Sequence, residues 1–338
     1  MKPRLALTMG DPAGIGPEIV VKAVREFEQA ELVVWGSPYV MEEAVRRFAP
    51  GLKLIVLKSL EALKTFSFSD NETLVCFAPD ETFYSSLTME EFCLGEISRK
   101  AGQAAYECVV SAAQAVIDGL ADAIVTAPIN KAAINLAGID NFCGHTELIA
   151  GMCNTESFSM QQSSGNLRVA FVTVHIPLSE VASSISIERI TTTANLLYNG
   201  IIEEGVTEPR IAVAAINPHA GENGYMGSED IQITEPAIEL LLAQGINAEG
   251  PFPPDTLFIP EVREQFDGIV SMYHDQGHIP FKMLAFDKGV NSTLGLPIIR
   301  TSVDHGTAFN LAWLGKANTG SLLAALELAA LKAGRKVK

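Results

Sequence analysis

The chain has 338 residues, of which 48% are hydrophobic and 19% are charged, as in an ordinary globular protein with a large buried core. Its formal net charge of -16 at pH 7 argues against binding to nucleic acid, because phosphate backbones are bound through an excess of lysine and arginine. A phosphate-bearing ligand is therefore expected to be small and to be held by a few local cations.

The cysteine content and the absence of long apolar runs predict a cytoplasmic protein. The five cysteines form no CxxC pair and are odd in number, which fits a reducing compartment better than a framework of disulfides. The stretch MKPRLALTMGD is not typical of a secretory signal. No run of 18 apolar residues occurs, so no membrane span is expected.

Short apolar runs alternate along the chain with longer segments of helical periodicity. The expected strands are 4–9, 32–35, 52–57, 74–77, 123–126, 169–174, 211–216 and 268–272. The expected helices are 17–28, 96–118, 187–204, 234–244 and 321–333. Continuously apolar strands between helices favour an α/β fold whose mostly parallel sheet is covered on both faces. The polar residues 154–166 are expected to form an excursion on the surface.

Polar segments cluster immediately after the expected strands. These segments read TMGDPAG, TAPINK, TVHIP, INPHAGE and MYHDQG. Ligands of open parallel sheets bind beyond the carboxyl ends of the strands, so several of these loops are expected to converge on one cleft. The segments GENG and DTLF are also expected to be loops.

Residues 272–310 are the richest part of the chain in ionisable side chains, and they contain half of its six histidines. Their glycines and prolines predict irregular backbone of the kind that carries binding and catalytic groups. The side chains concerned are those of His274, Asp275, His278, Lys282, Asn291, Arg300, Asp304 and His305.

The segment GDPAGIGPE, residues 10–18, follows the first expected strand and opens a helix. Free N–H groups at a helix N-terminus favour anions, so this segment has the character of a phosphate loop. It lacks the Gly-Lys-Ser/Thr of nucleotide-binding loops and the GxGxxG spacing, and Pro17 is also a plain helix-start signal. A phosphate loop and a structural turn both remain open.

Three histidines lie at or after the ends of expected strands, namely His175, His219 and His274. Three imidazoles with one open position describe a catalytic metal site, and Asp275 or Asp255 could add a carboxylate to it. The alternative is that each histidine is a hydrogen-bonded structural residue, because their spacing along the chain is too wide to form a metal motif by itself.

Several further side chains are candidates for holding an anionic substrate: His145, Thr146, Lys282, Asn291 and Arg300. Arginine offers a two-pronged donor to phosphate or carboxylate, and lysine offers a point charge. For Lys282 or Arg300 taken alone, the competing interpretation is an ordinary ion pair at the surface.

Nearly the whole chain carries motifs in an order that resembles one family. They read MGDPAGIGPE, TAPINK, GHTE, TVHIPL, NPHAGENG, GPFPPDTLF, YHDQGHIPFK and GVNSTLGLPIIRTSVDHGTAF. Together they resemble the 4-hydroxythreonine-4-phosphate dehydrogenase family. The resemblance implies an isocitrate/isopropylmalate dehydrogenase-like fold of two α/β/α domains with a cleft between them. It implies a first domain of residues 1–140 and 300–338 with NAD-binding loops. The second, residues 141–299, would hold the metal and substrate residues and the dimer interface.

The resemblance also implies a role for individual residues in a homodimer with shared active sites. A divalent metal, which could be Zn, Mg, Co or Mn, would bind His175, His219 and His274. Substrate would contact His145, Thr146, Lys282, Asn291 and Arg300. The cofactor NAD would lie against Gly295, Leu296, Asp304, His305 and Gly306. The base that removes the hydroxyl proton would be Asp255 or Lys282.

The implied reaction is an NAD-dependent, metal-assisted oxidation and decarboxylation of a 4-phosphorylated hydroxy acid. The first candidate substrate is 4-hydroxy-L-threonine phosphate, which belongs to pyridoxal phosphate biosynthesis. The alternative is D-threonate or D-erythronate 4-phosphate from sugar-acid catabolism, which His278, Pro280 and the stretch AFNLAW favour. An unphosphorylated diol carboxylate as substrate and a non-catalytic binding protein on the same fold remain as further alternatives.

Overall fold

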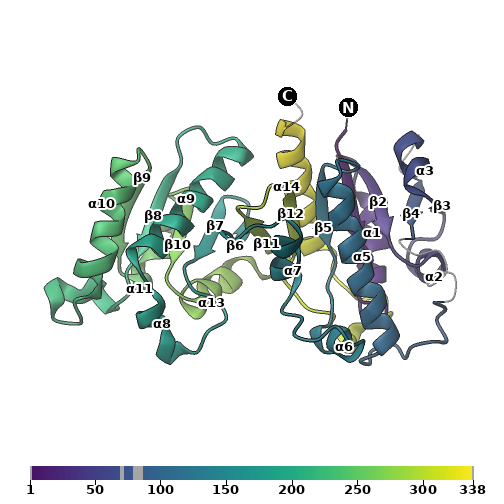
Figure 1. Cartoon of the computed structure of the whole chain (residues 1–338), viewed down its shortest axis with the longest axis horizontal. Helices are drawn as coiled ribbons and strands as arrows, with labels where there is room; N and C mark the ends of the chain where they lie inside the picture. Colours follow the sequence, from purple (N-terminus) through teal and green to yellow (C-terminus); the bar gives the residue numbers. More distant parts are fainter. Residues whose placement is uncertain (1, 69–71, 79–86, 337–338) are drawn as a thin grey trace. The chain divides into compact units, whose positions relative to one another are not determined.

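The computed structural model describes residues 2–68, 72–78 and 87–336. The chain divides into two compact units, which are visible as separate sets of elements in Figure 1. The first unit comprises Met1–Thr155 and Leu296–Lys338, and the second unit comprises Glu156–Gly295. Each unit is an α/β structure built around six of the described strands.

The sheet of the first unit is parallel. Its described strands run in the order β3-β4-β2-β1-β5-β12, and each neighbouring pair is parallel. The bounds of these strands are β1 (Arg4–Thr8), β2 (Glu31–Trp35), β3 (Lys53–Leu57), β4 (Thr73–Phe77), β5 (Ala123–Thr126) and β12 (Ile299–Val303). The strand β1 and its neighbours β5 and β12 therefore end at one edge of the sheet.

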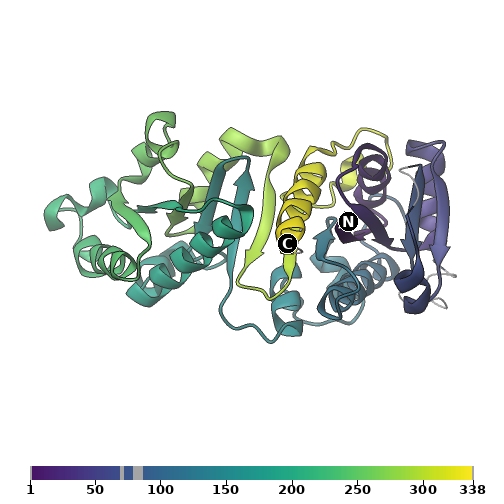
Figure 2. The same ribbon diagram turned by 90° about the horizontal axis from the view of Figure 1, so that it is seen from above.

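Helices cover both faces of this sheet. Figure 2 shows α1 and α5 on opposite sides of it, and α14 packs on β12 and β5 and also against α1. The helices are α1 (Gly16–Glu26), α2 (Pro38–Phe48), α3 (Leu60–Thr65), α5 (Arg99–Ile117), α6 (Lys131–Leu136), α7 (His145–Met152) and α14 (Gly320–Lys336), with the 3₁₀ turn η4 (Phe309–Leu311). The N-terminus of α5 is capped by Ser98, whose side chain accepts the Ala101 N–H, as expected of a serine at that position.

The sheet of the second unit is mixed. Its described strands run in the order β11-β6-β7-β10-β8-β9, in which β6 is antiparallel to both of its neighbours and the other pairs are parallel. Their bounds are β6 (Ser159–Ser164), β7 (Leu167–Phe171), β8 (Arg210–Ala214), β9 (Asn247–Phe252), β10 (Gly268–Ser271) and β11 (Val290–Leu294). As a result β7, β10 and β8 end side by side at one edge.

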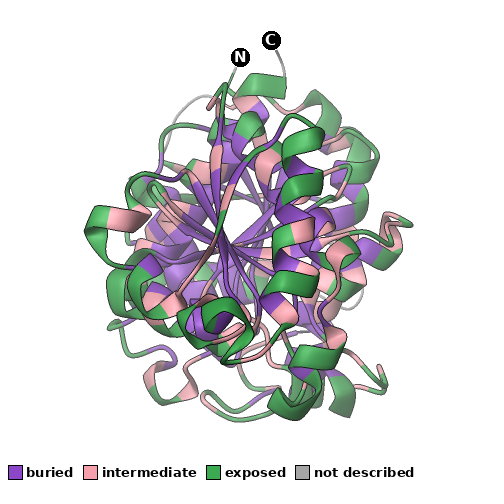
Figure 3. Ribbon diagram, turned by 90° about the vertical axis from the view of Figure 1, so that its left-hand side faces the viewer, coloured by how far each residue is buried: buried purple, intermediate pink, exposed green. Residues whose placement is uncertain are grey.

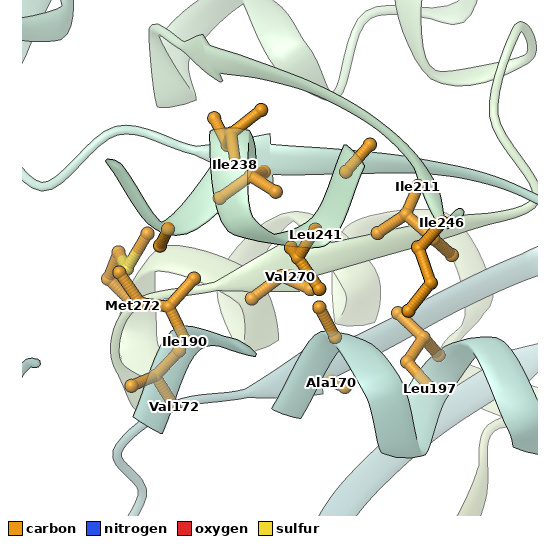
Figure 4. Packing of buried hydrophobic residues seen from close by; sticks show 14 of the residues in the cluster. Ala170, Val172, Ile190, Leu197, Ile211, Ile238, Leu241, Ile246, Val270 and Met272 are labelled. Carbon is orange, nitrogen blue, oxygen red and sulfur yellow. The ribbon is translucent and has the colours of Figure 1, made fainter. Parts of the chain in front are cut away.

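The second unit has a hydrophobic layer on each face of its sheet, because alternate residues of a strand point to opposite faces. Ala170 and Val172 belong to one layer and Val169 and Phe171 to the other. Figure 4 shows the first layer, in which the helices α9 and α10 cover the strands. The helix α13 covers the other face. Figure 3 colours the residues by burial and shows buried residues along the strands and exposed residues on the outer sides of the helices.

The helical segments of this unit are mostly short. They are α8 (Leu178–Ser184), α9 (Ile187–Glu204), α10 (Glu235–Ala243), α11 (Pro254–Leu257), α12 (Pro260–Arg263) and α13 (His274–Ala285), with the turns η1 (Pro218–Gly224), η2 (Asp230–Thr234) and η3 (Phe286–Lys288). The expectation of a loop for DTLF was wrong, because residues 254–257 form α11. GENG also departs from a plain loop, since it belongs to η1, whose residues 219–223 have positive φ angles.

The α/β class with a mostly parallel sheet is confirmed, and each of the eight expected strands and five expected helices overlaps an observed element of the same kind. The strands β6, β9, β11 and β12 were missed. Residues 154–166 are not a surface excursion, because they contain β6, whose sequence SMQQSS is largely buried. Its polar residues carry no apolar alternation, and only the neighbouring strands and helices bury it.

The expectation of irregular backbone for residues 272–310 was also wrong. It contains the twelve-residue helix α13, followed by β11 and β12. Gly277 lies within α13 because the helix packs tightly on β7. A Cβ at this position would lie 2.7 Å from a ring carbon of Phe171 and 2.9 Å from a methyl of Val169. The glycine thus marks a close approach of helix and sheet.

Candidate active site

Three loops of the first unit are joined by hydrogen bonds at the carboxyl ends of β1, β5 and β12. The Asp11 N–H donates to the carbonyl of Pro128 over 2.9 Å, and the Ile15 N–H donates to the carbonyl of Thr307 over 3.0 Å. The expectation that polar loops gather at this edge is correct for the segments TMGDPAG and TAPINK, and the segment DHGTAF joins them.

The loop that carries GDPAG is a structural turn and not a phosphate cradle. Three of its N–H groups are used within the first unit: Ala13 donates to the Asp11 carboxyl, Gly14 to the Asp11 carbonyl and Ile15 to the Thr307 carbonyl. The Asp11 side chain is fully buried, and this burial raises its pKa to about 6. A buried acidic group beside the turn would disfavour a bound phosphate.

The buried arginine of the first unit is Arg300, whose guanidinium lies between hydroxyl groups of two elements. It donates to Thr126 Oγ1 at the end of β5 over 3.0 Å and to Thr146 Oγ1 of α7 over 3.5 Å. The residue is only 4% exposed, and burial lowers the pKa of the guanidinium to about 10, with the charge of Glu147 opposing the shift. Arg300 therefore remains a cation at neutral pH.

His145 begins α7 next to this arginine. Burial lowers the pKa of its imidazole well below the usual value, and the charges of Arg300 and Lys131 lower it further, so the ring is neutral at pH 7. Its Nε2 atom is buried without a hydrogen-bond partner among the described residues. A buried cation, a neutral imidazole and the N–H groups of a helix N-terminus make a site that suits an anion.

The residues predicted to bind the cofactor lie in two places. Asp304, His305 and Gly306 follow β12, where the Asp304 N–H donates to Ser321 Oγ over 3.0 Å. The His305 Nε2 atom is buried and makes no hydrogen bond to the described chain. Gly295 and Leu296 follow β11, and a Cβ at Gly295 would lie 2.5 Å from the Ser157 carbonyl. Gly295 is therefore required by local packing, whatever its part in binding.

In the second unit, His175, His219 and His274 follow β7, β8 and β10, which are neighbours in the order β7-β10-β8. The ring centroids of His175 and His274 are 5.8 Å apart. The Nδ1 atom of His274 lies 2.6 Å from Asp275 Oδ1, which leaves Nε2 to face a ligand. A carboxylate that holds the other ring nitrogen is the usual partner of a metal-binding histidine.

The third predicted metal ligand, His219, is exposed in η1 with φ at 52°. Among residues 2–68, 72–78 and 87–336, no group of three or more His, Cys, Asp or Glu could hold a metal ion. The imidazoles of His175 and His274 thus suit a divalent cation in kind and in placement, but the three-histidine set is not assembled within one chain.

The other predicted residues of this unit occupy different elements. Asn291 lies on β11 opposite Gln162 of β6, and its side-chain amide lies 3.2 Å from Met160 Sδ. Lys282 is exposed on α13, and its charge contributes to the lowered pKa of His278. Asp255 is exposed in the first turn of α11. The catalytic roles of Lys282 and Asp255 stay predictions.

Sequence reasoning did not assign a role to four residues that touch these side chains or act on their charge: Thr126, Lys131, Gln162 and His278. Thr126 and Lys131 belong to TAPINK, which already stood out as a polar segment after a strand, so that signal was present in the sequence. Gln162 lies in a strand without a strand pattern, and no sequence signal indicated its contact with His278.

Comparisons with known proteins agree with this architecture. Residues 28–329 match the family model described as pyridoxal phosphate biosynthetic protein PdxA. The chain is 43% identical over 98% of its length to a 4-hydroxythreonine-4-phosphate dehydrogenase of Desulforapulum autotrophicum, covering 96% of that protein. It is 42% identical over 96% of its length to a D-threonate 4-phosphate dehydrogenase of Salmonella typhimurium, covering 97% of that protein.

A solved structure is also similar over the full length. The crystal structure of a 4-hydroxythreonine-4-phosphate dehydrogenase from Klebsiella pneumoniae matches with a TM-score of 0.86 and 40% identity, covering 98% of both chains. These relatives define the class of this protein as an α/β dehydrogenase. The chain belongs to the family of the pyridoxal phosphate biosynthetic protein PdxA. No helix in the part of the chain that the structure describes is long and apolar enough to cross a membrane.

Proposed function

We propose that this enzyme oxidises and decarboxylates a 4-phosphorylated hydroxy acid with NAD and a divalent cation. The observation that carries the proposal is the buried Arg300, held by the hydroxyls of Thr126 and Thr146 beside the neutral His145. A buried guanidinium next to a neutral imidazole and the N-terminus of α7 suits an anion, and a phosphate or carboxylate of the substrate is the ligand that we assign to it.

Each residue of this set has its own part in binding. Arg300 would offer parallel N–H groups to two oxygens of the anion. His145, because it is neutral, would offer Nε2 as a hydrogen-bond donor or acceptor without adding charge. Lys131, whose charge acts on His145, would compensate part of the negative charge of the ligand. The fixed anion would then set which substrate carbon is presented for oxidation.

His175, His274 and the more distant His219 are the residues that we assign to the divalent cation, with Zn, Mg, Co and Mn as the candidates. When bound, the nicotinamide supplies hydride acceptance and the cation supplies polarisation of the substrate oxygen. Asp275 would hold the tautomer of His274 through their 2.6 Å contact. The loop of Asp304, His305 and Gly306 would bind NAD together with Gly295 and Leu296.

The proton of the substrate hydroxyl needs an acceptor, and we assign this role to Lys282. It lies two turns after His274 on the same side of α13, because residues at spacings of four share one side of a helix. Asp255 of α11 is the second candidate. Asn291, on β11 next to β6, would orient the substrate through its amide.

We further propose that the enzyme is a homodimer that completes the metal site with residues of both copies. The helix that bears His274 also presents an exposed apolar stripe at helical spacing: Ile279 is 56% exposed, Met283 is 83% exposed and, in the next turn, Phe286 is 74% exposed. A second copy of the chain is the occupant that we assign to this stripe, because the histidine set of one chain is incomplete. The free cysteines support a cytoplasmic location.

NADH formation by the metal-reconstituted enzyme tests the proposed reaction. The substrates offered in parallel are 4-hydroxy-L-threonine phosphate, D-threonate 4-phosphate and D-erythronate 4-phosphate, with one unphosphorylated diol acid as a control. We expect turnover of 4-hydroxy-L-threonine phosphate, and the full-length similarity to a D-threonate 4-phosphate dehydrogenase makes the sugar-acid phosphates the second candidates. Turnover of the unphosphorylated acid alone would refute the phosphate assignment. If none of the four compounds gives NADH, the proposed reaction is refuted.

A further inference from the structure

His278 is the middle ring of a stack of three in the second unit, and a fourth ring lies beside the stack at a tilt. Its imidazole is stacked on that of His274, with the centroids 3.9 Å apart and the planes 8° from parallel. On the other side it stacks on Phe171 of β7, with a centroid distance of 4.3 Å and an interplanar angle of 29°. The ring of His175 lies 5.8 Å from that of His274. The ring of His278 therefore lies between the buried Phe171 of the sheet and the partly exposed imidazole of His274.

The imidazole ring of His278 is itself held in place by neighbouring groups. His278 is 6% exposed, and its Nδ1 lies 3.2 Å from the carbonyl of His274 one turn earlier. Its Nε2 lies 3.4 Å from the side-chain amide of Gln162. Gln162 lies opposite Asn291 in the β6–β11 register. The strand pair that carries the predicted substrate contact Asn291 therefore also holds the ring of His278.

His274 is constrained at one nitrogen and on one face. Asp275 holds Nδ1, but its side chain is 69% exposed and can move with the ring, so this contact alone does not fix rotation about the Cβ–Cγ bond. A parallel ring at stacking distance removes that freedom, because rotation out of the plane would drive the two rings into each other. The tilt of the His274 imidazole is thus set by His278.

We propose that His278 is a positioning residue for His274, and that the clamp of Phe171, His278 and Gln162 aims the His274 Nε2 atom at its ligand. The proposal rests on the proposed function, in which that ligand is a divalent cation. Ligand geometry that is held by surrounding side chains determines affinity, and removal of such support weakens metal binding about 10- to 100-fold.

Cobalt binding by the full-length protein tests this proposal, because Co²⁺ reports its ligand geometry in the visible spectrum and its affinity can be measured by chelator competition. The variant H278L, which stays apolar but loses the flat ring, should bind Co²⁺ about 10-fold or more weakly and with a changed spectrum. The variant H278F, which keeps a stacking ring, should restore most of the affinity. Should H278L not fold, H278Q provides the same comparison without a ring.

Two controls separate the possible causes. Phe281 is a fully buried ring on the same helix, so F281L reports a general loss of α13 packing and should bind Co²⁺ like the wild type. Equal weakening in F281L and H278L would overturn the positioning role, and so would an H278L protein with unchanged affinity and spectrum. The variant H274A should lose the site. If H274A binds Co²⁺ normally, the metal assignment in the proposed function fails, whatever H278L does.

Discussion

Replacing Asp11 with asparagine is expected to stabilise the first unit at neutral and alkaline pH. The carboxyl is fully buried, and burial raises its pKa from 3.8 to about 6. Between these values the folded state binds more protons than the unfolded state, so the contribution of Asp11 to stability is present below pH 3.8 and is lost as the pH rises through about 6. A shift of this size corresponds to about 3 kcal/mol.

Asparagine keeps the shape of the side chain and the oxygen that accepts the Ala13 N–H at 2.9 Å, but it cannot ionise. The advantage of D11N over the wild type should therefore grow by about 3 kcal/mol between pH 4 and pH 8. Urea unfolding followed by tryptophan fluorescence measures this, because both tryptophans, Trp35 and Trp313, belong to the first unit. The Trp313 indole N–H donates to the carbonyl of Pro12, next to Asp11.

The matched control is D140N, which changes an exposed aspartate of the same unit and should alter stability by less than about 0.5 kcal/mol at every pH. Parallel pH profiles for the wild type and D11N would refute the reasoning, since they would mean that the Asp11 carboxylate forms in the folded protein without a desolvation cost. A D11N protein that is less stable at pH 8 would refute it as well.

Four further predictions concern the proposed site. R300K should raise the KM of the phosphorylated substrate about 10-fold or more in initial-rate assays, because lysine cannot offer two parallel donors; an unchanged KM would place the anion elsewhere. G14A should raise the KM of NAD and leave that of the substrate unchanged, since a Cβ at Gly14 would lie 2.8 Å from the Thr307 carbonyl and displace the adjoining loop. The substitution H219A should abolish turnover, and so should dialysis of the wild type against a chelator. Near-wild-type activity of H219A would contradict the metal assignment. M283E should convert the proposed dimer to a monomer in sedimentation equilibrium, whereas an unchanged mass would exclude the α13 stripe as the interface.

The order of the main elements could be predicted from the sequence because helices and buried strands have local signals. The strands β1, β5, β8 and β10 have continuously apolar centres. The helix α9 begins and ends where its periodicity and its flanking Ser186 and Gly205 indicate. Strand β6 could not be predicted in this way. Its glutamines are buried by strands and helices distant in sequence, and no local pattern records such burial.

The candidate site residues also divide into features that the sequence shows and features that depend on distant contacts. The chain itself shows that histidines stand at or after three strand ends and that Arg300 and His145 occur in motifs of one dehydrogenase family, because residue type and order are properties of the sequence. Only the tertiary structure decided that β7, β10 and β8 end side by side, that the N–H groups of Asp11, Ala13 and Gly14 in the GDPAG turn are already used, and that His278 stacks on Phe171 behind His274. Strand order, the hydrogen bonds from Asp11 and Ile15 to Pro128 and Thr307 and the stacking of His278 on Phe171 join residues tens to hundreds of positions apart. Such pairings are set by the packing of the whole unit, not by the residues nearby in the chain.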